Sequence, residues 1–168
     1  MLLIHAFVFT ILAPGTMVVL LPYLLLQLEE QTGSFLLLQI VGGILIAPGV
    51  LIYLKCTWDF IRRGRGTPAW YRAPKKLVVQ GLYRYVRNPM YVGMGLICLG
   101  ESLYFSSFIL FCYTLGALLC FHLRVILYEE PVLRRQFGES YVEYCQRVNR
   151  WMPRVNKLTV SQKTNPAA

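Results

Sequence analysis

Two clusters of charged and aromatic side chains stand beside long apolar segments of this 168-residue chain. The first cluster lies in the stretch GLYRYVRNPMYVG and contains Tyr83, Arg84, Tyr85, Arg87 and Tyr91. The second cluster follows a later apolar run and contains Arg124, Glu129 and Glu130. Arginine within or beside a hydrocarbon phase is costly, so it is usually paired, turned to the interface or used in function. We therefore expect the two clusters to face one pocket.

A pocket of this composition suits a ligand that carries both signs of charge. Arginine binds carboxylate or phosphate, glutamate binds ammonium, and the face of a tyrosine ring attracts a flat ring or a sulfonium. The same residues also have simpler interpretations. Tyrosine and arginine are frequent anchors at membrane interfaces, and Glu129 with Glu130 could favour the positive end of a helix that begins at Pro131. Two adjacent carboxylates near Arg124 are more than a helix end requires.

The composition indicates a membrane protein of one domain. Hydrophobic residues make up 56% of the chain and the mean hydropathy is +0.49, which exceeds the usual composition of a soluble domain. The net charge of +9 comes from basic residues between and after the apolar runs, which fits a cytoplasmic membrane face better than nucleic acid binding. The five cysteines form no CxxC pair, so we expect neither disulfides nor a metal site.

Four apolar runs are candidates for membrane helices, because a span needs about 20 mostly apolar residues. A polar surface segment at 55–80 separates the first two runs from the last two, and the four runs are 1–28, 35–54, 90–100 and 108–127. The last two runs predict a helical hairpin. Its short first arm requires the turn before it to enter the membrane under a cover of protein or water.

Prolines and glycines predict where these helices bend, pack and end. Pro22 should bend the first helix, and Gly42 with Gly43 permits close contact of the second helix with a neighbour. Pro131 should begin a new helix after the fourth span ends near Tyr128.

The residues after Pro131 predict an amphipathic helix that lies on the membrane or on the hairpin. Its apolar residues recur at intervals of three and four, and they are Val132, Leu133, Phe137, Tyr141, Tyr144, Cys145 and Val148. Gly138 is expected to divide this helix in two. Trp151 is expected to anchor the chain at the membrane interface.

All seventeen lysines and arginines fall at Lys55 or later, away from the acidic Glu29-Glu30 link and the turn at Glu101. By the positive-inside rule, both termini and both clusters should face the cytoplasm. The expected fold is therefore all-α: a multi-pass integral membrane bundle of about four transmembrane helices plus cytoplasmic amphipathic helices. Its regions are a two-helix part, the hairpin with the C-terminal helices, and a disordered tail, at 1–60, 61–155 and 156–168.

At these residues the sequence resembles the isoprenylcysteine carboxyl methyltransferase and phospholipid methyltransferase family of integral membrane enzymes. The resemblance covers residues 75–154 and has four parts: GxYxxxRNPxYxG, the Glu129-Glu130 pair, FGxxYxxY and RWxPR. The prenylcysteine enzymes commonly have His where this chain has Asn88, and they usually have more membrane helices.

The resemblance implies that the hairpin and the C-terminal region bind S-adenosylmethionine. The implied cofactor-binding residues are Lys75, Lys76, Leu77, Val78, Tyr83, Arg87, Asn88, Pro89, Met90, Tyr91 and Glu129. The candidate catalytic residues are Arg124, which suits a carboxylate acceptor, and Glu130, which suits an amine. The expected partners are the lipid bilayer and an amphiphilic methyl acceptor.

The chemistry of the acceptor stays open between a carboxylate, a phospholipid amine and a thiol. Two other classes of protein are less favoured. One is a reductase that resembles the sterol reductases and binds NADPH, and the other is a non-catalytic membrane subunit that has kept the fold.

Overall fold

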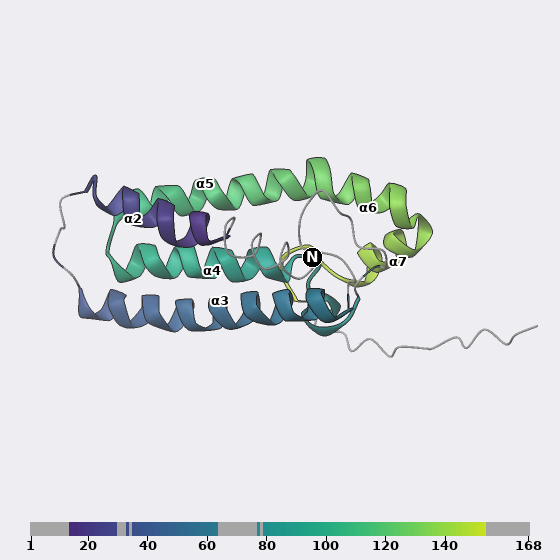
Figure 1. Cartoon of the computed structure of the whole chain (residues 1–168), viewed down its shortest axis with the longest axis horizontal. Coiled ribbons are helices and arrows are strands. Elements are labelled where there is room, and N and C mark those ends of the chain that lie inside the picture. Colours follow the sequence, from purple (N-terminus) through teal and green to yellow (C-terminus); the bar gives the residue numbers. More distant parts are fainter. Residues whose placement is uncertain (1–13, 30–32, 34, 64–76, 78, 154–168) are drawn as a thin grey trace, which may run out of the picture.

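The computed structural model describes residues 14–29, 33, 35–63, 77 and 79–153, and the elements it contains over these residues are helices. Three of them lie side by side in alternating directions (Figure 1), and they are α3 (Leu36–Arg63), α4 (Pro89–Tyr104) and α5 (Phe108–Arg124). The expected all-α class is therefore confirmed.

Further helices extend this array. Near the start of the described chain, η1 (Thr16–Leu20) leads into α2 (Leu21–Leu26), which packs against α5. After α5, η3 (Val125–Glu129) continues into α6 (Glu130–Phe137) along nearly the same line (Figure 1). The chain then turns into α7 (Glu139–Arg147), which contacts α6.

Within the described residues, two helical stretches are long and apolar enough to cross a membrane, Leu36–Asp59 and Phe108–Phe137. The apolar helix Thr16–Leu26 is shorter, and α4 has 16 residues. The arrangement with about four spans therefore stays a prediction. The tail from residue 156 lies outside the described residues.

Helices α3 and α4 pack backbone to backbone through glycines spaced seven residues apart on each helix. A Cβ added to Gly42 would lie 2.5 Å from the carbonyl oxygen of Gly100, and one added to Gly49 would lie 2.8 Å from that of Gly93. A Cβ on Gly43 would meet nothing within 4 Å. The predicted close contact is confirmed at Gly42, whereas Gly43 faces open space.

Two helices run past the ends that the sequence predicts. Helix α3 continues through the polar residues after Leu54 to Arg63, where Lys55 and Asp59 form an ion pair of 3.6 Å one turn apart. Helix α4 continues to Tyr104 rather than ending at Gly100, because Gly100 packs against α3 and Ser102 donates a hydrogen bond of 2.8 Å to the carbonyl of Leu99. The ion pair that accompanies the extension of α3 is local to that helix, whereas the contact of Gly100 with α3 is tertiary.

The predicted break before Pro131 was wrong, because the helix continues from α5 through η3 into α6. The five-residue π-helical segment η3 ends two residues before Pro131, and η1 stands in the same relation to Pro22. Proline lacks an N–H, and its ring clashes with the carbonyl four residues earlier. A locally widened turn accommodates that ring while the helix continues.

Gly138, with a φ of +54°, divides α6 from α7 as predicted. The apolar face of these helices packs on protein, because Tyr141, Tyr144 and Val148 are buried and Leu77 with Val79 packs against them. The two C-terminal helices thereby cover the segment that precedes α4.

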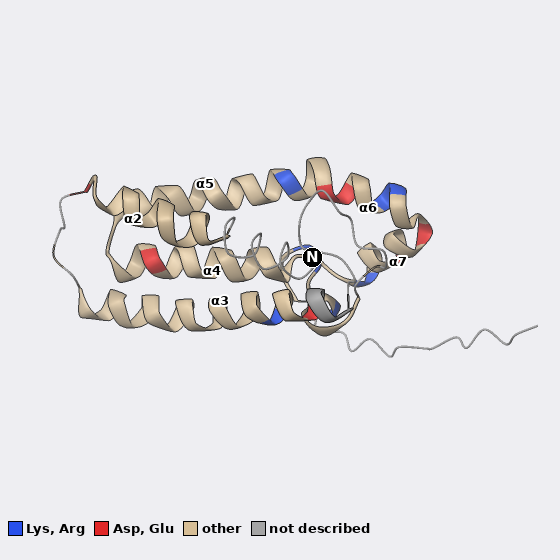
Figure 2. Cartoon of the chain, viewed as in Figure 1, with Lys and Arg blue, Asp and Glu red and all other residues tan. Residues whose placement is uncertain are grey.

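Charge is distributed unevenly along the bundle. Figure 2 shows the described lysines and arginines in the half that holds α6 and α7, while the half near the turn from α4 to α5 carries acidic residues. One of these, Glu29, accepts hydrogen bonds from the Ser107 hydroxyl and the Phe108 amide and so joins α2 to the start of α5. The basic end is the end at which the two predicted clusters lie.

Candidate active site

The two clusters predicted from the sequence lie in direct contact. Arg87 Nη1 donates a hydrogen bond of 3.1 Å to Glu130 Oε1, and the Tyr91 hydroxyl donates to Glu129 Oε1. These contacts join the start of α4 to the junction of α5 and α6. The two clusters are therefore neighbours. That they face one pocket stays a prediction, because Tyr91 is the one cluster residue among those that line the cavity described below.

Glu130 lies at the centre of an ionic clamp. It is 8% exposed, and Arg150 Nε and Nη2 bind its two carboxylate oxygens at 2.7 and 2.9 Å while Arg87 binds one of them as well. Hydrogen bonding to Glu130 raises the pKa of Arg150 above its ordinary value. The clamp thus fixes the chain after α7 against both α4 and α6.

Backbone contacts strengthen the same junction. Val86 and Asn149 form an isolated parallel bridge, and the Arg87 amide donates a hydrogen bond of 2.9 Å to the carbonyl of Asn149. The Asn88 side chain donates to the carbonyl of Arg150 at 3.3 Å. The loop before α4 and the segment after α7 therefore form one unit.

Arg87 has a buried donor that this network does not use. Its Nη1 atom serves Glu130 and, at 2.8 Å, the Cys145 thiol, but its Nε is buried and has no hydrogen-bond partner in the described part of the chain. A buried donor without an acceptor is costly. A ligand oxygen at this point would satisfy it.

Glu129 belongs to a second and more open ionic group. Its Oε1 accepts hydrogen bonds from the Tyr91 hydroxyl and from Arg124 Nε, the latter at 2.9 Å. The side chains of Arg124 and Glu129 remain 42% and 27% exposed. Unlike Glu130, they keep surface on which a ligand can bind.

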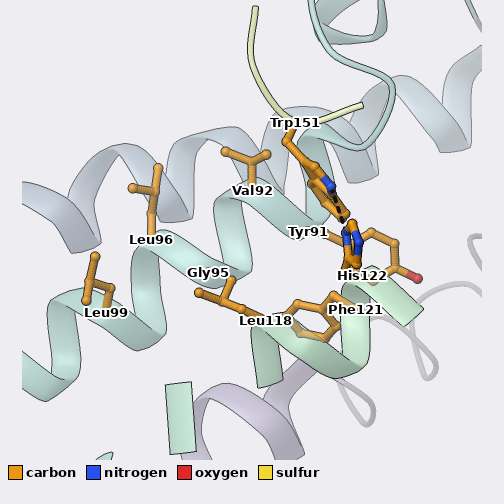
Figure 3. A pocket seen from close by; sticks show the side chains of 9 residues that line it. All are labelled: Tyr91, Val92, Gly95, Leu96, Leu99, Leu118, Phe121, His122 and Trp151. Carbon is orange, nitrogen blue, oxygen red and sulfur yellow. Dashed lines mark hydrogen bonds between the residues drawn. The ribbon is translucent and has the colours of Figure 1, made fainter. Parts of the chain in front are cut away.

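A cavity of about 380 Å³ runs between α4 and α5 beside this open group. Figure 3 shows Trp151 and His122 at one end and Leu99 at the other. The lining side chains are mostly apolar or aromatic, and they are Tyr91, Val92, Gly95, Leu96, Leu99, Leu118, Phe121, His122 and Trp151. The Tyr91 and Phe121 rings lie with centroids 4.9 Å apart.

His122 and Trp151 join across the mouth of this cavity, where the Trp151 indole donates a hydrogen bond of 3.1 Å to His122 Nδ1 (Figure 3). Trp151 also packs against the apolar cluster around Met94 and Phe121. The sequence predicts an interface anchor at this position. The indole lines one end of the cavity, and its role as an interface anchor stays a prediction.

The other predicted cofactor residues lie around the clamp. Pro89 is fully buried, Met90 is half-buried, and the carbonyl of Tyr83 accepts a hydrogen bond of 2.7 Å from Tyr144. Burial raises the pKa of the Tyr83 phenol, which keeps it protonated. Leu77 packs under α7. Three further predicted residues, Lys75, Lys76 and Val78, lie outside the described residues.

Three residues of the site had not been singled out from the sequence: Arg150, Cys145 and His122. Arg150 is the first residue of the RWxPR motif, so the sequence marked its position but did not indicate what it contacts. Cys145 belongs to the apolar stripe, and His122 is a single polar residue in an apolar run. Only the fold brings them to the clusters.

Among the described residues, no group of three His, Cys, Asp or Glu side chains is placed to hold a metal ion. The family model described as phospholipid methyltransferase matches residues 37–140, which is more than half of the chain. No solved structure matches the chain.

Several plant and fungal proteins are similar over about half of the chain. The Arabidopsis thaliana protein-S-isoprenylcysteine O-methyltransferase B is 36% identical over an alignment of 87 residues, and the match covers 48% of this chain and 41% of that protein. The Schizosaccharomyces pombe protein-S-isoprenylcysteine O-methyltransferase is 35% identical over 77 residues, 46% of this chain and 33% of that protein. The chain thus covers less than half the length of these relatives.

Proposed function

The chain belongs to the phospholipid methyltransferase family, and from this premise we propose that it is a membrane-embedded methyltransferase that uses S-adenosylmethionine. Its acceptor is a lipid-like or small amphiphilic molecule that reaches the site from the bilayer. The relatives that match part of this chain are named protein-S-isoprenylcysteine O-methyltransferases. Those names favour an oxygen atom as the methyl acceptor.

One observation supports the proposal above all others: Tyr91 belongs to both halves of the site. Its hydroxyl donates to Glu129 in the open ionic group, and its ring lines the apolar cavity. A transfer from a polar, charged donor to a lipid-like acceptor needs a charged site and a hydrocarbon site in contact. Tyr91 stands at that contact.

The residues present fit the cofactor. Glu129 offers a partly exposed carboxylate to an ammonium, and Arg87 Nε is a buried donor that lacks an acceptor in the described chain. The ring of Tyr91, whose hydroxyl contacts Glu129, suits a sulfonium. This set provides partners for each kind of charge that the cofactor carries.

The chemistry asks mainly for alignment and exclusion of water. S-adenosylmethionine supplies a methyl group on a positively charged sulfur. The apolar cavity walls exclude water, and Arg124 neutralises and orients a carboxylate acceptor, which needs no base. An amine or thiol acceptor must first lose a proton. Glu130 could take this role only if it left its two arginine partners.

The decisive experiment incubates membranes that contain the protein with methyl-labelled S-adenosylmethionine. Label in an extractable lipid or in a prenylated substrate is the expected result. Membranes that carry the Tyr91→Ala variant serve as the control and should lose the label. Absence of label, together with binding of NADPH but not of S-adenosylmethionine, would favour a reductase, and binding of neither would favour a non-catalytic subunit.

We also propose that the chain crosses the membrane about four times with the site toward the cytoplasm. The regions 1–60, 61–155 and 156–168 are then a two-helix part, the cofactor-binding part and a tail. The support is the collection of described basic residues at one end of the bundle (Figure 2). Single cysteines placed at Leu28 and Met152, both well exposed, should react with an impermeant thiol reagent from opposite sides of the membrane. Reaction of both from one side would contradict this topology.

A further inference from the structure

The cavity has few polar atoms, and most of them are already engaged. The Tyr91 hydroxyl donates to Glu129, and the Trp151 indole N–H donates to His122. His122 Nε2 has no hydrogen bond to any described residue. It is therefore the polar ring atom left to a ligand at this end of the cavity.

The bond from Trp151 determines which His122 nitrogen carries the proton. An indole nitrogen can only donate, so the Nδ1 atom that receives it must present a lone pair. A neutral imidazole carries its one proton on the opposite nitrogen, Nε2. At the mouth of the cavity His122 is thus a donor and not a base.

The surrounding charge favours the same kind of ligand. Three arginines and two glutamates form the two ionic groups beside the cavity, which leaves one positive charge among Arg87, Arg124, Arg150, Glu129 and Glu130. Below His122 the lining is apolar along Val92, Leu96 and Leu99. An amphiphile with an anionic oxygen head and a hydrocarbon tail complements both parts.

We propose that His122, held in its Nε2–H form by Trp151, binds the oxygen head group of the acceptor while its tail occupies the cavity between α4 and α5. His122 is then a specificity-determining residue and Trp151 a positioning residue. The inference rests on the proposed function for the identity of the ligand as an acceptor. Binding of the head group itself requires no cofactor.

The test measures quenching of Trp151 fluorescence by a fatty acid that is dibrominated near its carboxylate, in detergent and without cofactor. Trp58 and Trp70 are replaced by Phe so that Trp151 alone reports. A quaternary ammonium with the same brominated tail is the comparison ligand. One donated hydrogen bond should make the carboxylate bind about fivefold more tightly than the ammonium.

Two substitutions of His122 separate its donor role from a structural one. His122→Phe keeps an aromatic ring and should lower the head-group preference, while tail binding persists. His122→Gln can accept from Trp151 and still donate, so it should retain most of the preference. A matched protein in which Trp58 is the only tryptophan reports mere partition into the micelle, because Trp58 is exposed on α3 away from the cavity.

The inference would be overturned by equal quenching with the carboxylate and the ammonium ligand, by an unchanged preference in His122→Phe, or by equal quenching of Trp58 and Trp151. A preference for the ammonium would indicate an amine acceptor and would also overturn it. If the carboxylate preference is found but no methyl label is transferred, the proposed function fails and the binding role of His122 stands.

Discussion

Helix α4 has two unlike faces, and their difference separates scaffold from site. Toward α3 it presents Gly93 and Gly100, whose backbones touch those of Gly49 and Gly42. Toward α5 it leaves a cavity of about 380 Å³ that ends at charged and aromatic residues. The first face has no room for a methyl group, whereas the second has room for a ligand.

The two faces of α4 show how a small helical array can hold a site. In a membrane, helices gain little from hydrophobic burial and depend on close packing and polar contacts. The glycine contacts give α4 a firm position on one side. Its other side can then stay open, because the Glu130 clamp and the Glu129 group hold the charged ends of the helices together.

The largest effect is expected where the packed face is broken. Gly42→Ala places a methyl group against the backbone of α4 and should lower stability by about 3 kcal/mol. Gly43→Ala is the matched control, since it meets open space and should be neutral or stabilising by up to about 1 kcal/mol. Thermal unfolding in detergent measures both. Equal stability of the two variants would show that the α3–α4 contact is looser than described.

The next effect concerns the clamp that supports the open face. Glu130→Gln leaves Arg87 and Arg150 without their carboxylate and should cost about 1.5–3 kcal/mol, because hydrogen bonds to charged groups are lost. The exposed pair of Glu143 and Arg147 supplies the control, and Glu143→Gln should cost less than about 1 kcal/mol. The same unfolding assay compares them. If Glu130→Gln costs no more than the control, the clamp does not stabilise the fold.

A smaller effect separates the open ionic group from the clamp. Glu129→Gln keeps an acceptor for Tyr91 and Arg124 but loses the charge offered to the cofactor ammonium. Affinity for S-adenosylmethionine should fall roughly tenfold, as expected for one charge-assisted contact. Equilibrium binding measures it, with Glu139→Gln at the exposed start of α7 as the control. Unchanged affinity in a folded variant would make Glu129 a purely structural residue.

The smallest effect tests the acceptor. Arg124→Lys replaces a planar, two-pronged donor by a point charge, and turnover of a carboxylate acceptor should fall by about fivefold at most because this pair is partly exposed. Cofactor affinity should persist, and Arg135→Lys on the exposed face of α6 should change neither. Full turnover in Arg124→Lys would refute a role of Arg124 in holding a carboxylate acceptor. A loss of turnover in Glu130→Gln would not favour an amine, because that variant also breaks the clamp.

Local sequence patterns predicted much of this arrangement. The long apolar runs predict the helical class, the two clusters predict a shared site, and Gly138 predicts the break between α6 and α7. The helical class and the break follow from one stretch of chain at a time, because hydrophobic periodicity and backbone freedom are local properties. The shared site was inferred from the cost of charge beside apolar segments. The same holds for the family motifs around Arg87 and Glu129.

Tertiary structure alone decided the features that join distant stretches. In the folded chain the helix continues through Pro131. Glu130 binds Arg87 and Arg150 and so is not open to a ligand. Trp151 donates a hydrogen bond to His122. The physical reason is that hydrogen bonds and ion pairs depend on distances between elements, which no residue type specifies. The sequence by itself determined which residues carry charge and which helices are apolar, while packing determined which charges meet and where a cavity remains.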